Sequence, residues 1–173
     1  MIVALGSNRP GDHRSSEALL EAALSLFPQA GLPLLARSRW WRSAAWPDPN
    51  GDEYRNGIAI VETNDPPQAV LAQLFAIERR FGRRRGVPNA PRTLDLDLIA
   101  HGRLVVDEPG LILPHPRAAA RLFVMGPLAE VAPGWRHPVN GATAGALAAS
   151  ATVGRDAAPI PTPGCPGEGR DPS

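Results

Sequence analysis

The 173-residue sequence contains no lysine, and all 18 of its basic residues are arginines. A Walker-type phosphate-binding loop needs a lysine, and so does Schiff-base chemistry, so both are excluded. There is one cysteine, Cys165, and it lies in a segment rich in proline and glycine. We therefore expect neither a disulfide nor a thiol nucleophile.

Long apolar runs are also missing. No run approaches the 18 residues that a membrane-spanning helix needs. The apolar start of the chain, residues 1–5, is too short for a signal peptide and lacks its basic flank. These absences predict a soluble, cytoplasmic protein. Because the net charge is only +1, we expect neither nucleic acid nor a membrane as a partner.

The apolar content of 43% is sufficient for one globular domain with a sizeable core. We place this domain at residues 1–150. From Ala151 onward nine of 23 residues are proline or glycine, and few side chains remain that could be buried. Residues 151–173 are therefore expected to form a disordered tail.

Hydrophobic periodicity predicts that strands and helices interleave along the domain. The expected strands are residues 2–5, 34–42, 56–63, a segment from residue 94 onward, and 104–106, which would return beside that segment after a turn at residues 101–102. The expected helices are one capped by Ser15 or Ser16, one capped by Asp65 and ending at Gly82, and residues 121–131. Several connections are as short as hairpins. The pattern therefore favours an α+β fold with a largely antiparallel sheet over a parallel, doubly wound one.

The most informative chemical pattern is Leu94-Asp95-Leu96-Asp97-Leu98, in which apolar and acidic residues alternate. Side chains alternate between the two faces of a strand, so the leucines point together into a core. The two carboxylates point together the other way, with their Cα atoms roughly 6.5–7 Å apart. Carboxylates so placed repel each other unless a cation lies between them, and their oxygens are ligands that Mg²⁺ prefers.

Arginines gather just before this acidic pair: six of the 18 lie between Arg79 and Arg92. Guanidinium groups bind phosphate oxygens in a bidentate manner, and Arg92 is the best placed to do so. For Arg84 a solvated role is favoured. Read alone, Asp95 and Asp97 could equally be ordinary exposed charges. Beside the arginines they indicate a site for a metal-bound polyphosphate, most simply a nucleoside triphosphate.

The sequence resembles the 6-hydroxymethyl-7,8-dihydropterin pyrophosphokinases, a family of folate-biosynthesis enzymes. The motifs that carry the resemblance occur in the family's order as far as about residue 149. They are Leu5-Gly6-Ser7-Asn8, Ser43 to Trp46, Tyr54-Arg55-Asn56, Ile77-Glu78, Phe81-Gly82-Arg83, the highly specific Pro91-Arg92-Thr93-Leu94-Asp95-Leu96-Asp97, Pro114-His115, Arg121 with Phe123, and Pro127-Leu128. The resemblance implies a ferredoxin-like αβα sandwich. It also implies that ATP and Mg²⁺ are used to transfer diphosphate to the 6-hydroxymethyl group of 7,8-dihydropterin, with release of AMP.

The resemblance further implies roles for individual residues. Asp95 and Asp97 would be catalytic residues that bind two Mg²⁺ ions. The residues implied to bind the phosphates of ATP are Arg83, Arg85 and Arg92, which are also catalytic, together with His115 and Arg121. The residues implied to bind the pterin are Ser43, Ala44, Trp46, Tyr54, Asn56 and Phe123. No Cys/His spacing supports His115 as a zinc ligand.

Residue chemistry agrees with the pterin assignment. The amide of Asn56 can donate and accept hydrogen bonds together, as the lactam edge of a pterin requires. Tyr54 and Phe123 offer flat apolar surfaces to the ring, although a core role for Phe123 stays open on residue type alone. Glu78 carries little weight as a site residue, because an acid near the edge of an apolar helix stripe commonly faces solvent or pairs with an arginine such as Arg79.

Two alternatives accompany the expectation of an active, monomeric enzyme. Residues 86–90, Gly-Val-Pro-Asn-Ala, are about one residue shorter than in better-known family members and lack their Arg-Trp pair. This departure motivates a degenerate homologue that binds its ligands but turns over slowly. The other alternative is a ferredoxin-like nucleic-acid-binding module that uses the arginine run. The adjacent aspartates and the low net charge argue against that module.

Overall fold

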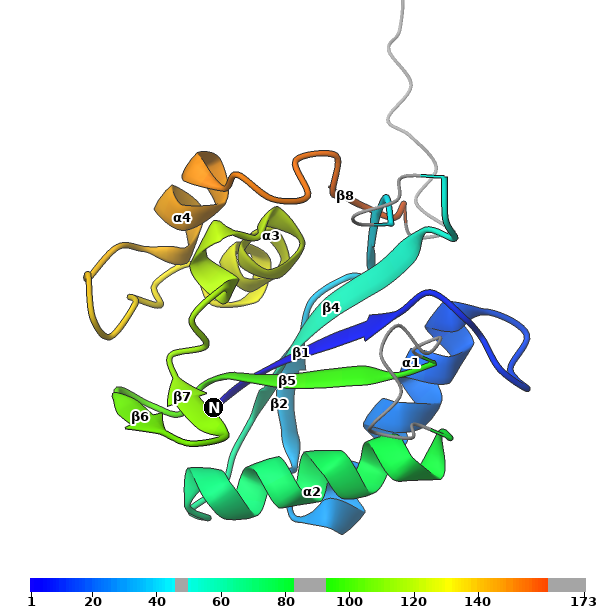
Figure 1. The fold of residues 1–173 in the computed structure, drawn as a ribbon, viewed down its shortest axis with the longest axis horizontal. Helices are drawn as coiled ribbons and strands as arrows, with labels where there is room; N and C mark the ends of the chain where they lie inside the picture. Colours follow the sequence, from blue (N-terminus) through cyan, green and yellow to red (C-terminus); the bar gives the residue numbers. More distant parts are fainter. Residues whose placement is uncertain (46–49, 83–92, 162–173) are drawn as a thin grey trace, which may run out of the picture.

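Two layers of helices enclose a mainly antiparallel sheet in the computed structural model, which describes residues 1–45, 50–82 and 93–161 (Figure 1). The six-stranded sheet has the order β5-β1-β4-β3-β8, and β2 also pairs with β4. Its strands are β1 (Ile2–Ser7), β2 (Leu34–Arg37), β3 (Trp41–Ser43), β4 (Tyr54–Val61), β5 (Asp95–Ala100) and β8 (Ala158–Pro159). All of their ladders are antiparallel. The predicted α+β class is confirmed.

The helices divide between the two faces of the sheet. One face packs against α1 (Ser16–Ser25) and α2 (Pro67–Arg80), and the other against α3 (Leu122–Val131) and α4 (Ala144–Ser150). Two short 3-10 turns, Pro28–Ala30 and Ala118–Ala120, and a small hairpin of β6 (Val106–Glu108) and β7 (Leu111–Leu113) complete the described chain. Alternate residues of the central strands therefore enter two separate cores.

The two cores follow from the alternation of side chains along β1. Val3 and Leu5 join the core beneath α1 and α2, whereas Ile2 joins the core beneath α3 and α4. Helix α1 begins as expected, because the Ser15 hydroxyl accepts a hydrogen bond from the Ala18 N–H at 3.1 Å. Gly6 and Ser7, at the end of β1, belong to neither core.

Three local predictions are wrong. Residues 34–42 form two strands rather than one, because the Trp40 ring lies directly on Gly57 and the buried Ser38 hydroxyl accepts from the Ile58 N–H, interrupting the ladder. Asp65 does not cap α2: its carboxylate accepts from Gln73 Nε2 at 2.7 Å, and Pro66 takes the N-cap position. Residues 104–106 do not return beside β5.

The chain instead leaves the main sheet after β5. Val106 belongs to the separate β6–β7 hairpin, whose connection includes Gly110 at φ +84°. A positive φ is readily adopted by glycine, so this residue permits the tight turn. The partner of β6 is therefore β7, which follows it directly.

The boundary drawn at residue 150 also needs correction. Residues 151–161 pack onto the domain: Ala151 and Ala157 are buried, and β8 pairs with β3. The expectation of disorder therefore fails for this stretch, and residues 162–173 lie outside the described part. The sequence pattern does not predict helix α4, because its seven residues are mostly alanine and carry little periodic signal.

Within the three described ranges, no helix is long and apolar enough to cross a bilayer. The longest, α2, has 14 residues.

Candidate active site

A row of residues crosses the sheet at the end of β1. Gly6 pairs with Asp95 of β5 on one side and with Asn56 of β4 on the other. Residues directly opposite in antiparallel strands project from the same face of the sheet. A Cβ placed on Gly6 would lie 3.7 Å from Asn56 Oδ1 and 3.9 Å from Asp95 Cβ. The sheet thus brings the predicted metal ligand and the predicted pterin ligand to either side of a residue without a side chain.

Strand β5 shows the alternation that its sequence predicts. Leu94, Leu96 and Leu98 are at most 4% exposed and belong to the core beneath α1 and α2. Asp95 and Asp97 lie between them in the strand, are half-buried, and project from the opposite face. The core side of β5 therefore fixes the direction of both carboxylates.

Glu78 braces this strand, which corrects the expectation that it faces solvent. Its side chain is 1% exposed, and its Oε1 accepts a hydrogen bond from the Leu96 N–H at 2.8 Å. Because β5 is an edge strand, the carboxylate takes the place of a neighbouring strand between the two aspartates. The available signal was its position beside Ile77 and four residues after Leu74 on the buried stripe of α2.

His115 lies beside the other end of β5. Its backbone N–H donates to the Ile99 carbonyl at 2.9 Å. Burial lowers the pKa of the imidazole; the Asp97 carboxylate opposes that shift, and the guanidiniums of Arg121 and Arg117 add to it. The predicted metal ligand Asp97 and the predicted phosphate ligand Arg121 therefore both lie close enough to His115 to shift its pKa.

The predicted pterin residues gather on β3, β4 and the start of α3. The Asn56 amide donates from Nδ2 to Ser43 Oγ at 3.0 Å, and both side chains are buried. Tyr54 pairs with Ser43 across the ladder and is half-buried. Phe123 is half-buried as well, packs at the margin of the core beneath α3 and α4, and lies 5.6 Å from the Arg121 guanidinium. Ala44 follows β3 and donates its N–H to Asp156.

Four predicted site residues, Trp46, Arg83, Arg85 and Arg92, lie outside the described residues, as do Arg84 and residues 86–90. The chain on either side of the arginine segment is described. Thr93 Oγ1 donates to the Phe81 carbonyl at 2.7 Å, so the described residues that flank residues 83–92 in the sequence are joined next to Asp95.

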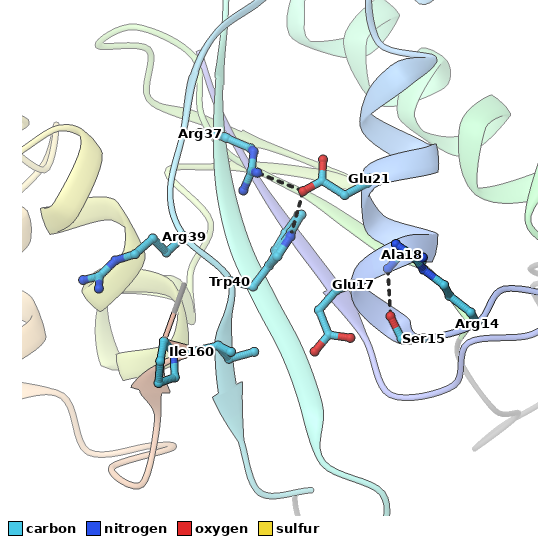
Figure 2. Close-up of a pocket in the computed structure, with 10 residues that line it drawn as sticks. Arg14, Ser15, Glu17, Ala18, Glu21, Arg37, Arg39, Trp40 and Ile160 are labelled. Atoms are coloured by element: carbon cyan, nitrogen blue, oxygen red, sulfur yellow. Dashed lines mark hydrogen bonds and ion pairs between the residues drawn. The ribbon is translucent and has the colours of Figure 1, made fainter. Parts of the chain in front are cut away.

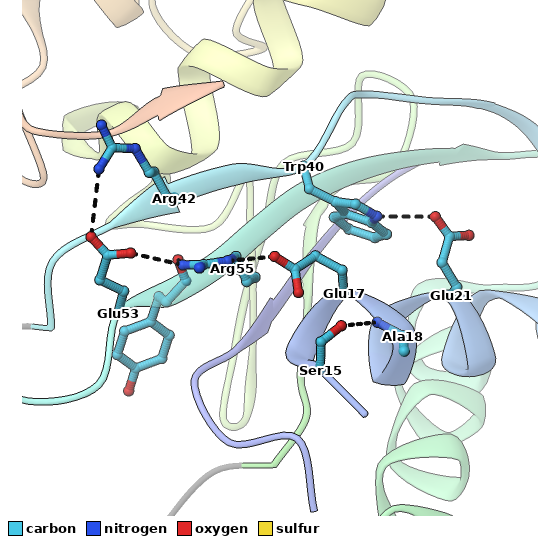
Figure 3. A network of polar contacts seen from close by, with 9 residues as sticks. Ser15, Glu17, Ala18, Glu21, Trp40, Arg42, Glu53 and Arg55 are labelled. Carbon is cyan, nitrogen blue, oxygen red and sulfur yellow. Dashed lines mark hydrogen bonds and ion pairs between the residues drawn. The ribbon is translucent and has the colours of Figure 1, made fainter. Parts of the chain in front are cut away.

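Arg55, between Tyr54 and Asn56 in the sequence, projects away from this row. Its guanidinium contacts Glu17 of α1 at 2.6 Å and Glu53 at 3.1 Å (Figure 3). Burial of Glu17 raises its pKa, but hydrogen bonds, among them one from Arg55, outweigh burial and leave the pKa lowered. The pair therefore attaches α1 to β4 and keeps Arg55 out of the candidate site.

A cleft of about 450 Å³ lies between α1 and the chain from β2 to the start of β3. None of the predicted site residues lines it. Both of its glutamates are already paired. Glu21 binds Arg37 and Trp40 (Figure 2), and Glu17 binds Arg55 (Figure 3). The cleft is therefore not the candidate active site.

The chain matches the model of the family described as 7,8-dihydro-6-hydroxymethylpterin-pyrophosphokinase over residues 2–133. The chain belongs to this family. A curated 2-amino-4-hydroxy-6-hydroxymethyldihydropteridine pyrophosphokinase from Synechocystis is 41% identical over 143 residues, which are 82% of this chain and 71% of the relative. The enzyme of the same name from Pseudomonas aeruginosa is 38% identical over 136 residues, covering 79% of this chain and 82% of the relative.

Solved structures support the fold of this pyrophosphokinase-family chain. Wild-type HPPK-DHPS from Plasmodium falciparum, crystallised with STZ-DHP, superposes with a TM-score of 0.67 at 14% identity. The superposition covers 86% of this chain and 42% of the Plasmodium chain, so this chain spans less than half of that protein.

The acidic pair fits a metal that arrives with a nucleotide. Among the described residues, no group of three or more His, Cys, Asp or Glu side chains could hold a metal ion by itself. Asp95 and Asp97 supply two carboxylates from one strand. Mg²⁺ is commonly bound by one or two carboxylates together with substrate phosphates and water, rather than by a complete protein cage.

Proposed function

We propose that this chain transfers a diphosphate group from ATP to the 6-hydroxymethyl group of 7,8-dihydropterin, with release of AMP, through the row Asp95, Gly6 and Asn56. The family relationship supports the reaction in folate biosynthesis, since relatives at 35–41% identity over most of the chain bear this enzyme's name. The observation that carries the residue assignment is the pairing of Gly6 with both Asp95 and Asn56.

The nucleotide half of the site lies along β5. Asp95 and Asp97 would hold two Mg²⁺ ions, which neutralise charge on the triphosphate when bound. His115 and Arg121, near Asp97, would bind phosphate oxygens. Arg83, Arg85 and Arg92, which precede β5 in the sequence, would add guanidiniums that can bind phosphate oxygens in pairs.

The pterin half lies on β4 and its neighbours. Asn56, held by Ser43, would hydrogen-bond the lactam edge of the ring through its remaining amide atoms. Tyr54 and Phe123 would contact the ring faces, with Ala44 and Trp46 contributing from the loop after β3. The pterin alcohol would then lie near Gly6, because a larger residue there would fill the space between Asn56 and Asp95.

In the reaction, the alcohol oxygen forms a bond to the β-phosphorus. The bond from that phosphorus to the oxygen bridging the α-phosphate breaks, AMP leaves, and the alcohol proton passes to solvent. Positioning of two bound substrates and neutralisation of phosphate charge supply the catalysis, as is common in phosphoryl transfer. We propose that one monomer contains the complete site.

An assay of AMP formation with ATP, Mg²⁺ and 6-hydroxymethyl-7,8-dihydropterin tests this function. We expect Asp95→Asn and Asp97→Asn each to lower kcat/KM by about 100-fold or more, because each removes a charge facing the metal. Asp107→Asn, at an exposed aspartate of β6, is the matched control. Thermal unfolding of each variant checks that it folds.

Two results would contradict the proposal. Near-normal AMP formation by folded Asp95→Asn and Asp97→Asn variants would remove the metal assignment. A wild-type chain that binds both substrates but forms almost no AMP would instead indicate the slow, degenerate homologue.

A further inference from the structure

We propose that the C-terminal segment, residues 151–161, positions the pterin-binding residues, with Asp156 holding Ala44 and Gly154 seating Phe123. This inference rests on the proposed function, because it concerns the pterin half of that site. It assigns a role to a stretch that lies beyond the residues matched by the family model.

The first connection joins the segment to the start of α3. Val153 bonds the chain on both sides of Arg121: its N–H donates to the Ala120 carbonyl, and its carbonyl accepts from the Leu122 N–H, both at 2.9 Å. The two backbones form a parallel bridge at Arg121 and Val153. The segment thus fixes the turn from which Arg121 and Phe123 project.

The second connection is the contact between Gly154 and Phe123. Gly154 has φ +66°, and a Cβ on it would lie 2.4 Å from Phe123 Cδ1. A real Cβ cannot approach an aromatic carbon so closely, so the ring rests directly on the glycine backbone. Because only glycine offers both this φ and this space, the segment sets how the aromatic ring lies.

The third connection reaches the loop after β3. Asp156 accepts a hydrogen bond from the Ala44 N–H, and β8 pairs with β3 through Ala158 opposite Arg42. The Ile160 N–H then donates to the Trp40 carbonyl at 2.8 Å. Fixing the N–H of Ala44 also fixes the plane of the peptide that joins it to Ser43, the partner of Asn56.

These connections join the two sides of the pterin site. Phe123 projects from α3, whereas Ser43 and Ala44 belong to β3 and its loop, and residues 153–160 contact both. Asp156 itself is exposed and belongs to neither core. Its carboxylate therefore serves the placement of the loop more than the stability of the fold.

The test measures the two substrates separately in the full-length chain. Asp156→Ala, Asp156→Asn and the control Asp107→Ala are compared by calorimetry: binding of the dihydropterin with a saturating non-hydrolysable ATP analogue and Mg²⁺, and binding of that analogue alone. We expect Asp156→Ala to raise the Kd for the pterin roughly three- to tenfold, the effect of losing one ordinary hydrogen bond at an exposed site. The Kd for the nucleotide should stay within about twofold.

Asp156→Asn keeps an acceptor oxygen and should recover part of the pterin affinity. The inference is overturned if Asp156→Ala binds the pterin as the wild type does, or if both ligands weaken equally. The wild-type AMP assay separates the two proposals. A wild type that neither forms AMP nor binds the pterin removes the proposed function and this inference with it, whereas an active wild type beside an unaffected Asp156→Ala removes the inference alone.

Discussion

Strand β5 and the C-terminal segment border the candidate site from opposite sides, and they are held by different forces. β5 is anchored by leucine side chains, with Leu94, Leu96 and Leu98 all buried. The segment buries only the small side chains Ala151 and Ala157, and its other contacts are mostly backbone hydrogen bonds to residues 40, 120 and 122. We therefore expect the stability of the fold to depend more on β5 than on the segment, and we expect the segment to act mainly on the local geometry of the proposed pterin site.

The largest expected effect is on stability, from Leu96→Ala. Leu96 is 1% exposed in the core beneath α1 and α2, and removing a buried leucine side chain costs about 2–5 kcal/mol. Denaturant unfolding measures the loss. Ala157→Gly also truncates a buried side chain, in the C-terminal segment, but it should cost much less because only one methyl group is removed. Equal losses would show that the segment is part of the cooperative core and would remove the contrast.

Glu78→Ala should have the next largest effect, and it sharpens the contrast by acting on β5 alone. It leaves the buried Leu96 N–H without its acceptor, which costs about 1–3 kcal/mol. We also expect a higher KM for MgATP, since the brace lies between Asp95 and Asp97. Glu78→Gln keeps an acceptor and should lose less. Arg80→Ala, exposed on the same helix, is the control; equal stability of Glu78→Ala and Arg80→Ala would refute the brace.

Alanine variants at two glycines distinguish the cost of backbone strain from the cost of disturbing the packing of Phe123. Gly154 and Gly141 both have positive φ, +66° and +72°, but only at Gly154 would a Cβ meet a ring. Gly141→Ala should cost about 1–2 kcal/mol from strain alone. Gly154→Ala should cost more in denaturant unfolding and should also weaken pterin binding. Identical behaviour of the two variants would show that the ring contact is unimportant.

The same division between side-chain and backbone anchoring explains which features the sequence predicts. Alternation identified the buried leucines and half-buried aspartates of β5, because burial of alternate side chains produces that pattern. The segment has no such pattern: its order comes from backbone groups, which every residue carries, so its proline and glycine content suggested disorder. The sequence does not predict the burial of Glu78 for a related reason. A buried acid needs a hydrogen-bond donor, and its donor, the Leu96 N–H, is identified only in the structure.

The sequence predicts the fold class and a set of candidate site residues. It does not predict where strands are interrupted or which strands lie side by side. The split of the expected strand at residues 34–42 depends on the Trp40 ring lying on Gly57, a contact between strands that no local pattern contains. The adjacency of Asp95 and Asn56 through Gly6 likewise depends on strand order, because the three residues are far apart in the chain.

The smallest expected effect is a pH dependence that arises at His115, beside the end of β5. Burial lowers the pKa of His115 below its ordinary value of 6.5 in the folded chain, against the attraction of Asp97. The unfolded chain therefore binds more protons in the interval below pH 6.5, so the free energy of unfolding should fall as the pH drops from 6.5 toward the folded pKa.

His115→Gln should flatten the curve in that interval, and the difference between the two unfolding curves isolates this imidazole from acids such as Glu17 that titrate at lower pH. Bound phosphates would favour the charged imidazole and raise its pKa. Binding of a non-hydrolysable ATP analogue near pH 6 should therefore take up protons, which calorimetry in buffers of different ionisation enthalpy measures. Equal proton uptake by wild type and His115→Gln would show that His115 does not face the nucleotide.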